Sequence, residues 1–463
     1  MSQNPAARRP ITSNEDAAER VRQSAHDFVK VGLTDIDGQM RGKYMHREKF
    51  LAALDTGFGF CDVVLGWDIN DQIYDNSRYT GWHTGFPDAP VRILPTSGRQ
   101  IPFEDGCWMF LGEFADPATE ICPRGVLSRV LDKANAMGFS VRAGFEYEFF
   151  VFDETLASAA AKQYRDMTPV ASGNTGYSLL RQSTLAPLYT DIFSSMAAMG
   201  IGLEGIHEEM GAGVIEAAIQ VDTALAAADK ASLFKTYTKA LVQNRELIAT
   251  FMAKWNMDEA GQSGHLHLSL TNNDSAENPF YNPTSDHGIS DTMRHFIGGQ
   301  QIHMAELTAM AAPTVNSYRR LIPGLWAPTD ATWGIDNRTC AIRALPGGPK
   351  SHRIEYRLPG ADANPYLVAA AAIASGLRGI EHRIEPTEAQ TGNAYDSDHP
   401  EHLRLPSNLS DAGIRFAESD MAREWFGDAF VDHFAASRDW EARQLKSDPT
   451  IGVAELDRYF ELI

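Results

Sequence analysis

Acidic and aromatic residues alternate in the stretch from Gly144 to Phe150, which reads Gly-Phe-Glu-Tyr-Glu-Phe-Phe. In a β-strand, side chains two residues apart point to the same face and lie about 6.6 Å apart. A strand here therefore presents Glu146 and Glu148 on one face and packs its aromatic side chains on the other. Taken alone, the pattern also describes a half-exposed strand with solvated glutamates. Three later segments repeat the arrangement and favour a functional site.

The second segment runs from Glu204 to Glu216. Glycines at positions 211 and 213 allow a sharp turn between Glu208 and Glu216. After the turn, Glu216 shares a face with Val214 and Ala218 by alternation. Each acid by itself also fits an ordinary surface residue.

The third and fourth segments, residues 264–270 and 353–358, alternate strictly between polar and apolar positions. Their polar faces carry His265, His267 and Ser269 in the third segment, and Arg353, Glu355 and Arg357 in the fourth. A lone histidine is usually structural, but two on a strand backed by leucines are candidate ligands or phosphate contacts. An exposed strand is the alternative for the fourth segment.

The four segments together predict one curved sheet lined with Glu, His and Arg. Such a lining is costly to bury unless divalent cations and anionic ligands neutralise it. Sites dominated by glutamate with one histidine suit Mg²⁺ or Mn²⁺ better than zinc.

Basic residues are dense between the third and fourth segments and at the start of the fourth. They are Arg319, Arg320, Arg338, Arg343, Lys350 and Arg353. The guanidinium group presents a planar fork to carboxylate and phosphate. Carboxylates followed by such a cluster indicate phosphoryl transfer from a nucleotide. The sequence has no Walker A motif and no GxGxxG, so neither a P-loop nor a Rossmann site is indicated.

The net charge of −20 over 463 residues argues against binding to nucleic acid or to an anionic membrane. The four cysteines are far apart without a CxxC pair, which predicts reduced thiols and a cytoplasmic protein. Met1 to Glu15 reads as a disordered leader without an apolar targeting segment. The most apolar run, Leu367 to Leu377, is too short to span a bilayer.

Periodicity and turn signals divide the chain into an N-terminal part with short strands and a later part with alternating helices and strands. A hairpin is expected from Phe28 to Tyr44, and the boundary between the parts is expected between Pro102 and Pro123. Helices are predicted at Asp16–His26, Arg124–Met137, Leu188–Met199, within Thr223–Trp255, from Asn364 to about Gly379, and in the region after Asn408.

These residues resemble the motifs of the glutamine synthetase family, in the family's order and over roughly residues 28–460. The motifs are Gly144–Phe150, the spacing from His207-Glu208 to Glu216, Gly264-His265 with Ser269, Asn316–Gly324, Asn337-Arg338, Arg353–Arg357 and Ala363–Tyr366.

The resemblance implies an α+β fold with an N-terminal β-grasp domain and a larger catalytic α/β domain built on a curved antiparallel sheet. It divides the chain into a leader and first helix (residues 1–27), the β-grasp domain (28–115) and the catalytic domain (116–463). It also implies a homo-oligomer, a dodecamer of two hexameric rings with each site between neighbouring subunits.

The resemblance also implies roles for individual residues. Two or more Mg²⁺ or Mn²⁺ ions per subunit are expected, one held by Glu148, Glu208 and Glu216 and the other by Glu146, His265 and Glu355. Arg320 and Arg357 match the arginines that hold glutamate and the transferring phosphate, and Gly261 matches a backbone contact to the amino acid. ATP contacts are expected from His267, Ser269, Arg338, Arg343, Lys350 and Arg353.

In the family mechanism, ATP phosphorylates the γ-carboxylate of glutamate, and an amine then displaces phosphate to leave an amide. Phosphorylation is needed because a carboxylate is a poor electrophile. The metals and arginines neutralise charge on the transferring phosphoryl group.

The sequence departs from the ammonia-using members at position 326. There, a glutamate two residues past the glycine of the 316–324 motif helps to bind and deprotonate ammonium, whereas this chain has Trp326. An indole accepts no proton but offers an apolar or cation–π surface. This favours an organic alkyl or aryl amine, giving a γ-glutamylamide in amine catabolism. The alternatives are ammonia, a polyamine, a non-catalytic structural relative, or Trp326 as a simple lid-packing residue.

Other positions near the expected amine pocket also diverge. Ala260-Gly261-Gln262-Ser263-Gly264 replaces the usual Asn-Gly-Ser-Gly. For the acid that binds the amine, the candidates are Asp68 and Asp88, and Tyr177 is the candidate for a pocket wall. Tyr395 lies near the position at which some members are adenylylated.

Overall fold

The computed structural model describes residues 10–445 and 450–463. Of the predicted leader, residues 1–9 lie outside this range. Asn14 and Glu15 do not belong to a disordered segment, because helix α1 spans Asn14–Arg22 and Ser13 caps it by accepting a hydrogen bond from the Asp16 amide. The helix thus begins two residues before the predicted start and ends before His26, because Gln23 caps its end.

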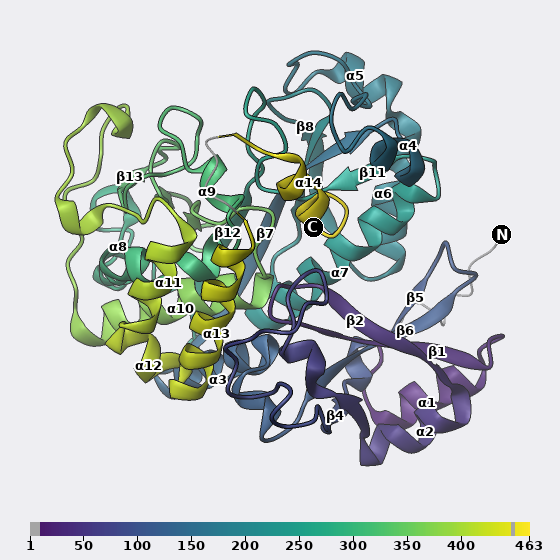
Figure 1. The fold of residues 1–463 in the computed structure, drawn as a ribbon. Helices are drawn as coiled ribbons and strands as arrows, with labels where there is room; N and C mark the ends of the chain where they lie inside the picture. Colours follow the sequence, from purple (N-terminus) through teal and green to yellow (C-terminus); the bar gives the residue numbers. More distant parts are fainter. Residues whose placement is uncertain (1–9, 446–449) are drawn as a thin grey trace.

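The first sheet has six strands in the order β2-β1-β6-β4-β3, with β5 also paired to β6. Its strands are β1 (Phe28–Thr34), β2 (Met40–His46), β3 (Phe58–Cys61), β4 (Asp88–Ile93), β5 (Arg99–Ile101) and β6 (Cys107–Phe114). The predicted hairpin is confirmed, since β1 and β2 pair from Phe28 with His46 to Thr34 with Met40. Figure 1 shows this part in purple and blue below the rest of the chain.

The second sheet has nine strands in the order β13-β14-β15-β12-β7-β9-β8, with β10 and β11 also paired to β7. Its strands are β7 (Phe139–Phe152), β8 (Leu203–Glu208), β9 (Val214–Ile219), β10 (Asp222–Thr223), β11 (Ile248–Thr250), β12 (Gly264–Asn272), β13 (Trp333–Ile335), β14 (Ile342–Leu345) and β15 (Arg353–Tyr356). The prediction that the four polar segments share one sheet is confirmed. The sheet is not wholly antiparallel, because β13 and β14 run parallel.

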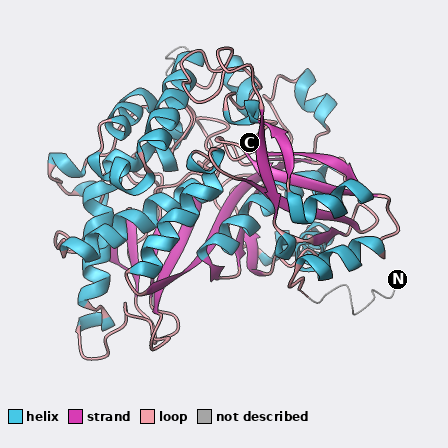
Figure 2. Cartoon of the chain, turned by 90° about the horizontal axis from the view of Figure 1, so that it is seen from below, coloured by secondary structure: helices cyan, strands magenta, loops and turns pink. Residues whose placement is uncertain are grey.

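Helices cover the sheets on the outside, as Figure 2 shows in cyan around magenta strands. Besides α1 they are α2 (Arg47–Thr56), α3 (Pro123–Ala136), α4 (Leu156–Ala161), α5 (Leu179–Thr184), α6 (Ala186–Ala198), α7 (Ala224–Gln243), α8 (Asp291–Ala311), α9 (Ser317–Arg320), α10 (Pro365–His382), α11 (Leu409–Ala417), α12 (Asp420–Phe426), α13 (Asp428–Gln444) and α14 (Val453–Tyr459). The helices predicted near 124–137, 188–199 and after 408 are confirmed within a few residues. The predicted 223–255 helix ends at Gln243, and β11 follows it.

Helix α10 continues past Gly379, where its end was predicted. Gly379 does not end the helix but lies where α10 packs closely against α8. A Cβ atom added at Gly299 of α8 would lie 2.2 Å from the Ser375 carbonyl oxygen and 2.5 Å from the Gly379 Cα atom. The glycines thus let α8 and α10 approach closely, and Arg383 in left-handed conformation ends α10 instead. No helix among residues 10–445 and 450–463 is long and apolar enough to cross a membrane.

The rear of β7 is packed as the alternation predicts. Phe145 and Tyr147 stack with ring centroids 5.9 Å apart, and Phe149 stacks on Phe251 at 4.9 Å. These side chains are at most 2% exposed. The glutamates between them therefore face the opposite side of the sheet, which carries the site.

Candidate active site

Pairing between neighbouring strands aligns polar side chains in rows across the second sheet. In the first row, His207 of β8 lies opposite Glu216 of β9, and Glu216 lies opposite Glu148 of β7. Cβ atoms of residues directly opposite in an antiparallel pair lie about 4.5–5.5 Å apart. The backbone register alone therefore gathers these three side chains.

Two further rows continue the polar face. Glu146 of β7 pairs with His265 of β12, and His267 pairs with Glu355 of β15. The carboxylate of Glu355 is held from three sides: its oxygens lie 3.3 Å from His265 Nδ1, 2.5 Å from Arg357 and 2.9 Å from Arg343.

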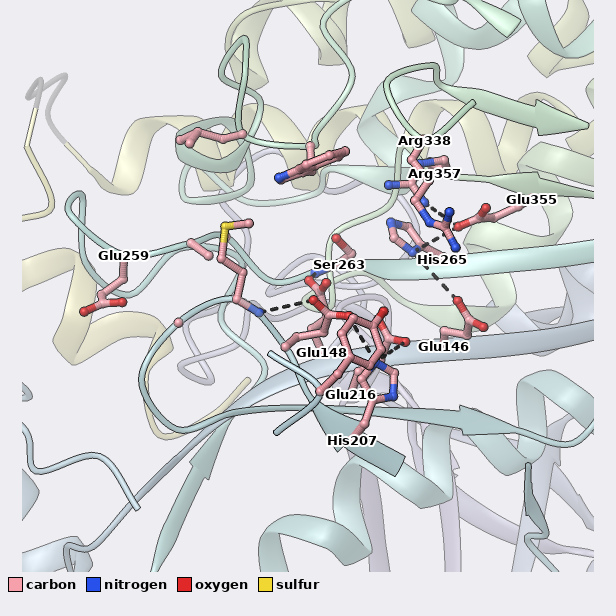
Figure 3. Close-up of a pocket in the computed structure, with 18 of the residues that line it drawn as sticks. Glu146, Glu148, His207, Glu216, Glu259, Ser263, His265, Arg338, Glu355 and Arg357 are labelled. Carbon is pink, nitrogen blue, oxygen red and sulfur yellow. Dashed lines mark hydrogen bonds and ion pairs between the residues drawn. The ribbon is translucent and has the colours of Figure 1, made fainter. Parts of the chain in front are cut away.

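The rows line a cavity of about 930 Å³. Figure 3 shows His207, Glu148 and Glu216 together at one side of it, and His265, Glu355, Arg338 and Arg357 together at another. The described lining is Glu146, Glu148, Asn174, Tyr177, His207, Glu209, Met210, Gly211, Glu216, Met257, Asp258, Glu259, Ala260, Gly261, Ser263, His265, His267, Leu325, Trp326, Arg338, Arg343, Arg353, Glu355 and Arg357.

The carboxylates repel one another strongly in the absence of a cation. Burial, reinforced by the charges of Glu148 and Glu146, raises the pKa of Glu216 to about 9. Burial would likewise raise the pKa of Glu355, but His265 and Arg357 outweigh it and hold the pKa well below its usual range. Without a cation, the acids at the Glu216 end of the cavity therefore cannot all be ionised near neutral pH. At the Glu355 end, Arg357 and Arg343 already balance the negative charge.

The donor atoms present fit divalent cations. One ligand atom each of Glu146, Glu216 and His265 lies within 4.8 Å of the others, and the same holds for His207, Glu209 and Glu216. His265 Nε2 is buried without a hydrogen-bond partner among the described residues, and burial holds the pKa of His265 well below its usual value. A neutral imidazole among carboxylates is the donor set expected for Mn²⁺ or Mg²⁺.

Glu208 is not among the residues that line the cavity, and Glu209 takes the place predicted for it. Glu208 pairs with Ile215 and so points to the rear face, where it is 4% exposed and burial raises its pKa. The chain leaves β8 after Glu208, and the next residue, Glu209, returns to the face of His207. Alternation from His207 to Glu209 is the sequence signal that places Glu209, and not Glu208, on the face of the cavity.

The predicted arginines divide into two groups. Arg338, Arg343, Arg353 and Arg357 line the cavity. Arg320 is 3% exposed behind it and donates to the Leu358 carbonyl and the Ser263 hydroxyl.

Two of the predicted ATP contacts, Ser269 and Lys350, lie in an adjoining cavity. That cavity shares Glu146, His267 and Arg353 with the larger one. The residues predicted to contact phosphate and nucleotide therefore line two adjoining cavities.

Trp326 stands at the mouth of the cavity on the loop after α9. Its φ is +61°, that of Gly324 is +80°, and the indole is 49% exposed. The Tyr395 hydroxyl donates to the carbonyl of the next residue, Ala327, at 3.0 Å and so holds this loop. Tyr177 and Gly261 also line the cavity, as predicted for a pocket wall and a backbone contact.

Asp68 does not lie at the cavity of its own chain. It is fully buried, and its carboxylate accepts hydrogen bonds from Trp440 at 2.8 Å, Arg458 at 2.7 Å, and the Asn70 and Gln72 amides at 2.9 Å. Both oxygens are thus occupied by the fold, which corrects the prediction that Asp68 binds the amine. Asp88 lies in β4, opposite Cys61, and is also absent from the described lining.

Comparison with known proteins identifies the family. The glutamine synthetase catalytic domain matches residues 120–459. The chain belongs to the glutamine synthetase family. Enzymes of this family use ATP and divalent metal ions, in agreement with the carboxylate rows and the arginines.

Several members are similar over nearly the whole chain. Type-1 glutamine synthetase 2 of Dictyostelium discoideum is 39% identical over 96% of this chain and 85% of its own length. Glutamate–isopropylamine ligase of a Pseudomonas species is 36% identical over 94% and 95%, and γ-glutamylethanolamide synthetase of Streptomyces coelicolor is 35% identical over 95% and 96%.

The fold is also that of the family. The solved structure of GmaS in complex with ADP superposes with a TM-score of 0.80 at 27% identity, over 92% of this chain and 95% of that one.

Proposed function

We propose that the protein is an ATP-dependent ligase that joins the γ-carboxylate of L-glutamate to an organic primary amine, through a γ-glutamyl phosphate. The observation that carries this proposal is Trp326 at the mouth of the cavity. Because an indole has no basic site and a broad apolar face, it suits an amine with an apolar body better than ammonium. Leu325, Met210 and Met257 extend this apolar surface.

Two relatives support an organic amine. One is named a glutamate–isopropylamine ligase and the other a γ-glutamylethanolamide synthetase. The alignment with each covers about 95% of this chain. Ammonia remains the second candidate, because the Dictyostelium relative is a glutamine synthetase.

The rows, with Glu209 beside them, support the following metal-binding roles. Glu148, Glu209 and Glu216 hold one Mg²⁺ or Mn²⁺ ion, and Glu146, His265 and Glu355 hold the other. When bound, the ions supply positive charge that offsets the phosphates of ATP. Arg357, Arg338 and Arg343 face the same volume, while Arg320 positions Ser263 and the backbone before Pro359.

We further propose the domain and assembly organisation implied by the resemblance. Residues 28–115 form an N-terminal β-grasp domain and residues 116–463 the catalytic domain. Twelve copies assemble as two hexameric rings. Analytical ultracentrifugation of the purified chain tests the ring size.

Phosphate release from ATP and glutamate tests the function, with ammonium compared against a panel of alkyl, aryl and hydroxyalkyl amines and diamines. We expect at least one organic amine to exceed ammonium in kcat/KM. In Trp326→Glu, the ratio of kcat/KM for ammonium to kcat/KM for the organic amine should rise. The matched control is Trp82→Glu, because Trp82 is 81% exposed and is not part of the described lining.

Two outcomes would contradict the proposal. Ammonium used at least as well as every amine would make the protein a glutamine synthetase. An unchanged preference in Trp326→Glu would remove the role given to the indole.

A further inference from the structure

His207 lies in the first row beside the acids proposed to hold a metal, and sequence patterns gave it no role. Its Nε2 atom is 3.0 Å from Glu209 Oε1 and 3.5 Å from Glu216 Oε1. The residue is opposite Glu216 in the β8–β9 pair, so the backbone register fixes this neighbourhood. Figure 3 shows His207 projecting toward Glu216 from its own strand.

The imidazole is oriented by a contact that does not use its nitrogen atoms. The ring of Tyr177 stacks on it, with centroids 4.5 Å apart and an interplanar angle of 12°. The Tyr177 amide in turn donates to the Glu208 carbonyl at 2.9 Å, which ties the stacking residue to β8. Nε2 is thereby kept directed between two carboxylates.

We propose that His207 Nε2 is a direct ligand of the divalent ion held by Glu209 and Glu216. A neutral imidazole nitrogen and two carboxylate oxygens, all within 4.8 Å of one another, can converge on one ion. This inference rests on the metal assignment proposed above and is independent of which amine is used.

Ligation by His207 has a consequence for metal preference. Mg²⁺ prefers oxygen ligands and strict octahedral geometry, whereas Mn²⁺ and Co²⁺ accept imidazole more readily. With His265 at the other ion, each proposed site then contains one nitrogen ligand. Both sites should therefore favour Mn²⁺ over Mg²⁺.

Crystals of the full chain soaked in Mn²⁺ test the geometry by anomalous diffraction. We expect a peak within coordination distance of His207 Nε2 as well as of Glu209 and Glu216. A peak held by the acids alone, with His207 Nε2 outside coordination distance, would overturn the proposal and leave His207 as a hydrogen-bond partner of Glu209.

Calorimetric titration of the protein with Mn²⁺ and with Mg²⁺, without nucleotide, tests the contribution of His207 to metal affinity. In His207→Ala, Mn²⁺ affinity at one of the two sites should fall by about 10- to 100-fold, and Mg²⁺ affinity by less, so that the Mn²⁺/Mg²⁺ preference narrows. The matched control is His295→Ala. His295 lies on α8, and its Nε2 atom is 2.9 Å from Glu385. Unchanged Mn²⁺ binding in His207→Ala would also overturn the proposal.

His207→Gln is a second variant that is expected to keep the fold, because the glutamine side chain is polar and fits the same position in β8. Thermal unfolding of each variant in chelator establishes that the fold is kept. If His207→Gln folds and binds Mn²⁺ as the wild type does, the imidazole is not a ligand. A loss of Mn²⁺ affinity that exceeds the loss of Mg²⁺ affinity, with amine selectivity unchanged, would support the proposal and leave the proposed function untouched.

Discussion

At the scale of single residues, Glu216 is where the two groups of proposed metal ligands meet. One of its oxygens lies near Glu146 and His265, and it also closes the group with His207 and Glu209. Burial, reinforced by the repulsion among these acids, raises its pKa. A cation relieves this repulsion, so the acids oppose folding in the absence of metal and favour metal binding.

Glu216 should make the stability of the metal-free protein depend on pH. The folded pKa of about 9 is above the ordinary glutamate value of 4.5, so between these pH values the folded chain keeps a proton that the unfolded chain has lost. Stability should therefore fall as pH rises between these values, by at most about 1.4 kcal/mol per pH unit. Thermal unfolding in chelator should show less pH dependence in Glu216→Gln than in the wild type, while the exposed Glu204→Gln should leave the dependence unchanged.

Neighbouring acids at the end of β8 should differ sharply in their effects. Glu209→Ala removes a carboxylate beside the first row and should lower Mn²⁺ affinity at one site by at least about tenfold. Glu208→Ala removes a rear-face carboxylate and should leave Mn²⁺ affinity within about twofold. Calorimetry on both variants decides this, and equal losses would contradict the register of β8 and β9.

At the scale of elements, the loop from Leu321 to Pro328 connects α9 to the mouth of the cavity. The Tyr395 hydroxyl donates a hydrogen bond to the Ala327 carbonyl of this loop. Next to it, the backbone of Trp326 and Gly324 is in the left-handed conformation. The position of the indole thus depends on a segment more than sixty residues away in the sequence.

Tyr395→Phe should loosen this loop without changing its sequence. A single neutral hydrogen bond contributes about 1 kcal/mol, so the KM for the amine should rise about fivefold while the KM for ATP stays the same. Hydrogen exchange should increase in residues 321–328. An equal rise in both KM values would indicate a general loss of structure.

At the scale of the whole molecule, a buried ionic network joins the N-terminal part to the C-terminal helices. Arg458 of α14 contacts Asp68 at 2.7 Å and Glu441 of α13 at 2.5 Å, and Arg438 of α13 contacts Asp37 at 2.5 Å. Segments almost 400 residues apart in sequence are thereby held together. Helices α13 and α14 also contact Asn70, Asp75 and Asn76.

Arg458→Met should destabilise the protein by about 3–5 kcal/mol, because it leaves Asp68 and Glu441 buried without a counter-charge. The matched control, Arg415→Met, removes an ion pair with Asp411 in which both side chains are 40% exposed, and should cost less than about 1 kcal/mol. Urea unfolding followed by tryptophan fluorescence measures both. Equal effects would show that the network contributes no more than a surface pair.

Alternation in the sequence was sufficient to predict the strands of the site and most of its acids. Glu146, Glu148, Glu216, His265 and Glu355 could be placed on one face because the side-chain period of a strand is two. The same period fails at the end of a strand: Glu208 and Glu209 differ by one residue, and only the pairing of Glu208 with Ile215 shows which faces the cavity.

The sequence by itself determined the family, the polar face of the central sheet and the unusual Trp326, since these depend on local pattern and on residue identity. Only the tertiary structure decided that Glu209 and His207 lie together beside Glu216, that Tyr395 holds the loop of Trp326, and that Asp68 belongs to an ionic network. The physical reason is that pairing register and contacts between distant segments are set by the packing of the whole chain.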